Sequence, residues 1–104
     1  MHDLTAFQRD ILYVVAGLDN SYGLGIKRGL EGYYHTEINH GRLYPNLDSL
    51  VERGLLEKSA LDKRTNLYTL TDEGYESIRE RRSWEDDNVG EDEAEAGSSG
   101  RVGA

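Results

Sequence analysis

The sequence predicts a mainly α-helical fold with one small β-hairpin, an α+β arrangement. Apolar residues recur at helical spacing in three successive segments that end by Gly54. Two short segments of alternating residues, 55–60 and 66–70, then flank a polar turn. A fourth amphipathic segment follows from Thr71. At 104 residues, the chain is long enough for one such domain but not for two.

The first helix is predicted from Thr5 to Leu18. Thr5 and Gln8 have the spacing of a capping box, in which each side chain satisfies a backbone N–H group of the first turn. The apolar positions at helical spacing are Leu4, Phe7, Ile11, Val14, Val15 and Leu18. A second apolar side is formed by Leu12, Tyr13 and Ala16. Such a helix is either central within its domain or has more than its own domain to cover.

The second helix is predicted over residues 24–34, after a turn at Asp19–Asn20. The residues expected to face inward are Ile26, Leu30 and Tyr33. The helix also contains three glycines, Gly25, Gly29 and Gly32. Each glycine weakens a helix by up to about 1 kcal/mol relative to alanine, so three of them indicate close packing rather than a helix stable on its own.

The third helix is predicted to begin after Asn39, a favourable N-cap residue. Its buried stripe is expected to be Leu43, Leu47, Leu50 and Val51. Gly54 stands where a left-handed residue ends a helix. The ring of Pro45 would clash with the carbonyl group of Gly41, so either the first turn is distorted, with Gly41 yielding, or the regular helix begins near Tyr44. The distorted first turn is favoured.

The hairpin and the last helix complete the predicted domain, residues 1–84. A basic turn, residues 61–65, joins the two strands, and Thr71 caps a helix expected to end near Trp84. The expected inner face of that helix is Tyr75, Ile78 and Arg82. Three helices followed by a hairpin describe a winged helix-turn-helix. Residues 85–104 are acidic and then Gly/Ser-rich, and they are predicted to form a disordered tail.

The charge of the chain is unevenly distributed. It carries 20 acidic and 12 basic residues, a formal net charge of -8, and most of the excess lies after Arg82. The body contains only three lysines against eight arginines. Such an acidic, lysine-poor surface predicts a protein dissolved in concentrated salt, from a haloarchaeal source; the alternative is an ordinary acidic protein. The tail is expected to promote solubility, with autoinhibition at the basic turn as the less favoured role.

Composition argues against several classes of function. The chain has no cysteine, which rules out disulfides, thiolate metal sites and cysteine nucleophiles. Neither a signal peptide nor an apolar run of about 18 residues is present, so the protein is expected to be cytoplasmic. The three histidines lack metal-ligand spacing, and no arrangement of catalytic residues is recognisable. The protein is therefore predicted to be no enzyme and to bind no metal or cofactor.

Three stretches of the sequence resemble the PadR family of transcription regulators. Residues 38–47 read Ile-Asn-His-Gly-Arg-Leu-Tyr-Pro-Asn-Leu, close to the family's recognition-helix pattern Ser-x-Gly-Thr-Leu-Tyr-Pro-x-Leu. Residues 23–26 and 68–74 resemble the opening of its second helix and its exit from the wing. The positions that depart from the family pattern are Leu24, Asn39, Arg42 and Asn46. The last three are expected opposite the leucines, where they favour readout of base edges.

The resemblance implies a sequence-specific DNA-binding regulator, more a repressor than an activator, that binds an inverted repeat as a homodimer. Base contacts are expected from Arg42 first and Asn46 second, because arginine pairs with guanine and asparagine with adenine in the major groove. Phosphate contacts are expected from Asn39, His40 and Tyr44, and further DNA contacts from Ser49, Lys63, Arg64, Lys27 and Arg28.

The dimer interface is expected on the first and last helices, at Leu4, Phe7, Ile11, Tyr75, Ile78 and Trp84. A small-molecule effector has no support in the sequence. Tyrosines 13, 22, 33 and 34 are expected in the core and interface rather than in a ligand pocket. The alternative function is a protein-interaction module that has this fold but does not bind DNA, which the acidic surface would suit.

Overall fold

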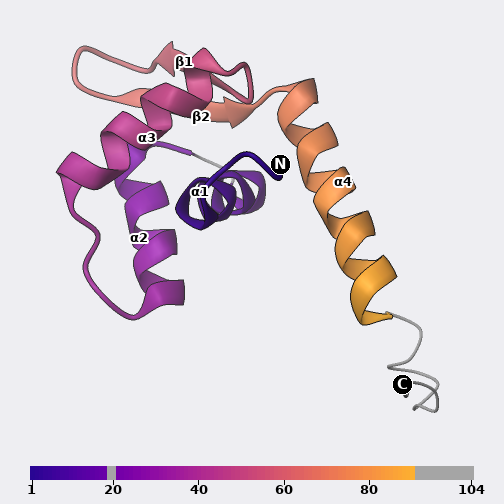
Figure 1. Ribbon diagram of the computed structural model, residues 1–104. Coiled ribbons are helices and arrows are strands. Elements are labelled where there is room, and N and C mark those ends of the chain that lie inside the picture. Colours follow the sequence, from indigo (N-terminus) through magenta and orange to yellow (C-terminus); the bar gives the residue numbers. More distant parts are fainter. Residues whose placement is uncertain (19–20, 91–104) are drawn as a thin grey trace.

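A computed structural model describes residues 1–18 and 21–90 of the chain. Its elements, in order, are α1 (Ala6–Gly17), α2 (Gly23–Tyr34), α3 (His40–Glu52), β1 (Leu56–Ala60), β2 (Asn66–Leu70) and α4 (Asp72–Val89). This order confirms the predicted fold class (Figure 1). The turn expected at Asp19–Asn20 and most of the expected tail, residues 91–104, lie outside the described residues.

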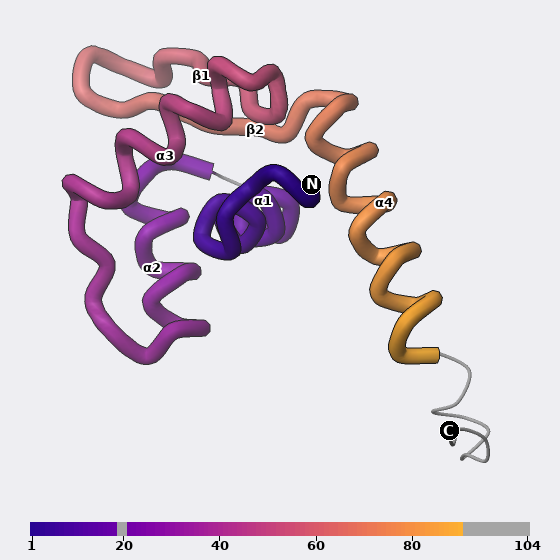
Figure 2. Tube along the Cα trace, viewed as in Figure 1, coloured from indigo at the N-terminus to yellow at the C-terminus, as the bar shows by residue number. Residues whose placement is uncertain are grey.

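Helix α1 is the centre of the domain. The predicted capping box is present: Gln8 N donates to Thr5 Oγ1 at 3.1 Å, and Thr5 N donates to Gln8 Oε1 at 3.2 Å. Ile11 and Leu12 are completely buried, because α1 packs against α2, α3, β2 and α4. In the tube view α2 and α4 lie on opposite sides of α1 (Figure 2). The central position of α1 therefore accounts for Leu12 on its second apolar side, whereas Tyr13 and Ala16 stay exposed.

Four residues predicted at the dimer interface belong instead to the core of this chain. Leu4, Phe7, Ile11 and Ile78 are each at most 9% exposed. Side chains that are already covered by their own domain cannot supply a partner surface, so this part of the prediction is wrong. Tyr75 and Trp84, by contrast, are 46% and 53% exposed.

Helix α2 lies close to α1, as its glycines suggested. A Cβ atom at Gly29 would lie 2.7 Å from Val14 Cγ1, whereas Gly32 has nothing within 4 Å. The prediction that Tyr33 faces inward is wrong, because Tyr33 is 72% exposed. Tyr34 packs towards α1 instead, and its hydroxyl donates to Asp10 Oδ2 at 2.5 Å. Tyr33 and Tyr34 follow Leu30 by three and four positions, so either could face inward from the sequence alone. The position of α1 determines that Tyr34 does.

Helix α3 has both predicted ends. Asn39 Oδ1 accepts from Gly41 N at 2.6 Å, and Gly54 has the left-handed φ of 79°. Beyond the helix, Leu55 N donates to Leu50 O at 3.0 Å, which completes a Schellman-type end. Its fully buried residues are Leu43, Leu47 and Leu50. The helix runs without a break from His40 through Pro45. Because proline has no N–H group, Pro45 leaves the carbonyl group of Gly41 without its usual helical donor.

The hairpin pairs antiparallel from Leu56 opposite Leu70 to Ala60 opposite Asn66. Its turn is fixed by Asp62, whose Oδ1 accepts from Arg64 N and Thr65 N, both at 2.8 Å. A connection that the sequence did not predict ties the link before α2 to the hairpin: Tyr68 N donates to Ser21 O at 2.8 Å. The hairpin is thus held against the start of α2.

Helix α4 is longer than predicted and ends at Val89, five residues beyond Trp84. Residues 85–89 were assigned to the disordered tail from their acidity, but they continue the helix to the left-handed Gly90. Tyr75 and Arg82, both expected on the inner face, are exposed, so the prediction holds only for Ile78. Arg81, next to Arg82, is half-buried, with its guanidinium 4.5 Å from the centre of the Trp84 ring.

Candidate nucleic-acid interface

Two flanks of α3 border its buried leucines, and the exposed residues Gly41, Pro45, Asp48 and Glu52 lie between these flanks. One flank, with Tyr44, faces the N-terminus of α2: a Cβ atom at Gly23 would lie 2.8 Å from Tyr44 Cζ. The other flank, with Arg42 and Asn46, faces α1. The N-terminal half of α3 therefore stands between the hairpin turn and α1.

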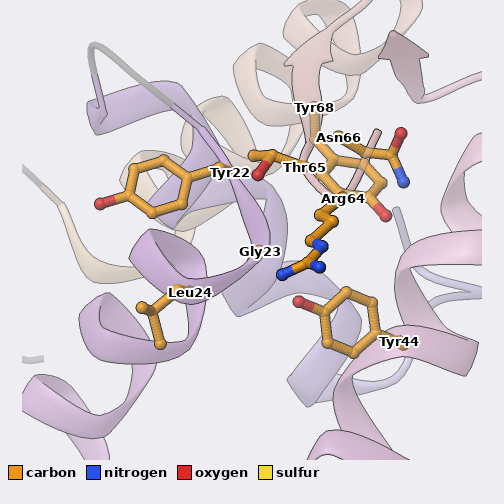
Figure 3. Close-up of a pocket in the computed structure, with 8 residues that line it drawn as sticks. All are labelled: Tyr22, Gly23, Leu24, Tyr44, Arg64, Thr65, Asn66 and Tyr68. Carbon is orange, nitrogen blue, oxygen red and sulfur yellow. The ribbon is translucent and has the colours of Figure 1, made fainter. Parts of the chain in front are cut away.

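A cleft of about 260 Å³ opens on the Tyr44 flank. Its lining residues are Tyr22, Gly23, Leu24, Tyr44, Arg64, Thr65, Asn66 and Tyr68. Figure 3 shows the guanidinium of Arg64 and the hydroxyl of Tyr44 converging in front of Gly23. None of the lining residues is acidic, although the chain has 20 acidic residues.

The start of α2 adds positive character to this cleft. The N-cap residue Tyr22 makes no side-chain hydrogen bond to the first turn. The N–H groups at a helix start and the helix dipole favour anions. Together with Arg64 and Tyr44, they give the cleft hydrogen-bond donors suited to a phosphate oxygen. Tyr22 and Gly23 were not predicted as site residues; the sequence signal was their place at the start of α2.

The two residues predicted to read bases differ in the structure. Asn46 is half-buried, and both ends of its amide are engaged: Oδ1 accepts from Gln8 Nε2 at 3.0 Å, and Nδ2 donates to Arg42 O at 2.8 Å. The prediction that Asn46 points outward to adenine is therefore corrected. Arg42 is exposed, and its guanidinium lies 3.9 Å from the centre of the Phe7 ring.

The other predicted contacts are partly available. His40 is exposed at the start of α3 and stacks on Tyr44, with ring centres 5.4 Å apart. Asn39 caps the helix, and Ser49 is half-buried. Lys27 is already paired with Glu31 at 2.6 Å, which leaves Arg28 as the exposed cation of α2. The expectation for Lys27 is thus weakened by its ion pair.

The free positive charge gathers at one end of this surface. Further along, Arg53 pairs with Asp3, and Lys58 Nζ lies 3.7 Å from Asp48 Oδ1. Within residues 1–18 and 21–90, the side chains of Arg42, Lys63 and Arg64 form no ion pair. Arg42 lies on the N-terminal half of α3, and Lys63 and Arg64 lie on the hairpin turn.

The side chain of Tyr34 braces the α1 side of this surface. Burial and the hydrogen bond to Asp10 raise the pKa of Tyr34 to about 12. The hydroxyl therefore stays protonated and keeps donating to Asp10 across the physiological pH range.

No helix in the described part of the chain is long and apolar enough to cross a membrane, and no cluster of metal-ligating residues occurs there.

Comparison with known proteins finds similar sequences and structures. The model of the transcriptional regulator PadR-like family matches residues 11–80. RosR from H. salinarum, in a structure described as grown from NaBr, is 56% identical in sequence. The match covers 86% of this chain and 81% of that chain, and the two structures superpose with a TM-score of 0.82. A complex structure of hsRosR-S1 is 56% identical over 84% of this chain and 77% of that chain, with a TM-score of 0.81.

A more distant structure shares the fold alone. F93 from STIV, described as a winged-helix DNA-binding protein, is 19% identical, covers 85% of this chain and 96% of that chain, and has a TM-score of 0.70. No curated protein has significant similarity to the chain.

Proposed function

Because the chain belongs to the PadR-like family of DNA-binding transcriptional regulators, we propose that it represses transcription as a homodimer bound to an inverted-repeat operator. The observation that carries the proposal is the cleft formed by Tyr44, Arg64 and the α2 N-terminus, which has no acidic lining residue and lies beside the exposed start of α3. In this arrangement the cleft holds the DNA backbone and fixes the register in which α3 enters the major groove.

Within that arrangement, Arg42 is the base-reading residue. It is an exposed cation in the N-terminal half of α3, the part of a recognition helix that contacts base edges. Its guanidinium can donate two hydrogen bonds to guanine O6 and N7. Asn39 and His40 at the helix start and Lys63 on the hairpin turn supply further backbone contacts.

Selection of duplexes from a random-sequence pool tests this function. The expected result is an enriched site with two related half-sites in inverted orientation, about one helical turn apart. Placing that site over a promoter should then lower expression of a reporter when the protein is present. A pool that shows no enrichment at any salt concentration would contradict DNA regulation and favour the protein-interaction module.

Arg64→Ala is expected to weaken binding to every duplex, because a phosphate contact carries no sequence information. The slope of log affinity against log salt should become shallower by about one unit. The matched control is Arg82→Ala, which removes the same charge from an exposed position on α4. Equal slopes for Arg64→Ala and the wild type would contradict the role of the cleft.

The proposed dimer uses the exposed aromatic surface of α1, α2 and α4. Its large exposed residues are Tyr13, Tyr33, Trp84 and Val89, whereas the exposed Tyr75 lies nine positions before Trp84 and thus on the opposite side of α4. Tyr13 and Tyr33 line one depression together with Glu85 of α4, so three helices contribute to this face. A two-fold dimer would present two copies of α3 to paired half-sites.

Trp84→Ala is expected to weaken the dimer at least about 30-fold, since a buried interface tryptophan contributes roughly 2 kcal/mol or more. Sedimentation equilibrium in molar salt measures the dissociation constant. The control is Leu61→Ala, which removes an exposed apolar residue from the hairpin turn. A wild-type protein that is monomeric at micromolar concentration would reject the dimer, whatever the variants do.

A further inference from the structure

Helices α1 and α3 are joined by a chain of polar contacts that ends at the backbone of Arg42. Gln8 Nε2 donates to Asn46 Oδ1 at 3.0 Å, and Asn46 Nδ2 donates to Arg42 O at 2.8 Å. Gln8 is only 8% exposed, and its Oε1 is fixed by the cap at Thr5. The side-chain amide of Asn46 therefore has a defined orientation, and its hydrogen bond helps to hold the backbone carbonyl group of Arg42 in place.

The side chain of Arg42 is ordered by the same helix. Its guanidinium carbon lies 3.9 Å from the centre of the Phe7 ring, within the range of a cation–π contact. Phe7 is 5% exposed and is backed by Tyr34, with ring centres 6.1 Å apart. The hydrogen bond from Tyr34 to Asp10 holds that second ring in turn. Phe7 thus offers Arg42 a fixed platform.

Stacking leaves the hydrogen-bonding edge of the guanidinium unused. Among the described residues, the side chain of Arg42 makes no ion pair, and its contact with Phe7 involves the face of the ring. An arginine free in solvent loses much rotamer freedom when it forms two hydrogen bonds, whereas a stacked one has lost part of that freedom already.

We infer that Phe7 and Gln8 of α1 are positioning residues that preorganise Arg42 for bidentate recognition of guanine. This inference rests on the proposed function, in which Arg42 is the reader. It assigns part of the sequence discrimination to α1, a helix that does not itself enter the groove. Neither residue needs to contact DNA, because both act through Arg42.

The test uses Phe7→Leu, which keeps an apolar side chain but removes the ring face. Affinity for the selected site should fall about two- to fivefold, as expected for loss of a cation–π contact, while affinity for a random duplex stays unchanged. In an Arg42→Ala background, Phe7→Leu should have no effect on the selected site. A drop of the same size in that background would overturn the inference.

Two further variants separate positioning from folding. Val15→Ala removes buried apolar surface from α1 about two turns from Phe7, and it should leave the ratio of specific to random affinity unchanged. Gln8→Glu keeps the acceptor for the Thr5 cap but lacks the donor to Asn46, and it should lower that ratio. An unchanged ratio for Gln8→Glu would remove Gln8 from the inference, even if Phe7→Leu could not be folded.

If Arg42→Ala itself leaves specific binding intact, Arg42 is not the base-reading residue and the proposed function must be revised. If Arg42→Ala loses specificity while Phe7→Leu and Gln8→Glu do not, Arg42 remains the base-reading residue and the positioning role of Phe7 and Gln8 is overturned. The two failures are therefore distinguishable in one set of binding curves.

Discussion

Arg42→Ala is expected to reduce the preference for the selected site over random DNA by about 5- to 150-fold. A bidentate arginine–guanine pair contributes roughly 1–3 kcal/mol of discrimination, which corresponds to this range. The loss should concentrate on one base pair of each half-site, so a guanine substituted there should no longer matter to the variant. Competition binding at constant salt measures the ratio directly.

The matched control for this variant is Arg53→Ala. Arg53 lies at the end of α3, where its side chain pairs with Asp3, so the variant removes the same charge from the same helix without touching the proposed reader. It should change affinity for both duplexes alike. A preference that survives Arg42→Ala but is lost in Arg53→Ala would move base reading to the other end of α3.

Gly74→Ala is expected to destabilise the protein by about 3 kcal/mol. A Cβ atom at Gly74 would collide with the carbonyl oxygen of Leu55 and would lie 2.8 Å from Leu70 Cδ2. The carbonyl belongs to the backbone at the start of the hairpin and also accepts from Thr71 N, so it cannot move without loosening the junction between hairpin and α4. Overpacking of this kind typically costs about 1–3 kcal/mol.

Chemical denaturation measures this effect, and Gly32→Ala provides the opposite control. Gly32 lies within α2 and has nothing within 4 Å of an added Cβ atom. Alanine there should stabilise the protein by about 0.5–1 kcal/mol, because it lowers the entropy of the unfolded chain and favours the helix. Equal effects of the two substitutions would show that the Gly74 contact is relaxed in solution.

Much of the fold could be predicted because its signals are local. The cap at Thr5, the cap at Asn39 and the left-handed Gly54 each depend on a few neighbouring residues, and all three are confirmed. The buried leucines of α3 follow from a period of 3.6 residues, which is a property of the helix itself. The hairpin was predicted to within one residue for the same reason.

The candidate site was predictable only in part. Periodicity separates the leucines of α3 from the rest, but it does not say which neighbour lies against each flank. Asn46 directly precedes the buried Leu47, so it is turned only partly away from the core and meets α1. The cleft at Arg64 needs the hairpin turn, α2 and α3 together, and no single segment contains that information.

By itself, the sequence determined the order of elements, their caps and the apolar stripe that anchors α3, since these arise from interactions between residues close in the chain. Only the tertiary structure decided that Phe7 supports Arg42, that Asn46 is held by Gln8, and that Leu4, Ile11 and Ile78 belong to the core rather than to an interface. These outcomes depend on how α1 is packed among the other elements, and packing joins residues that are far apart in sequence.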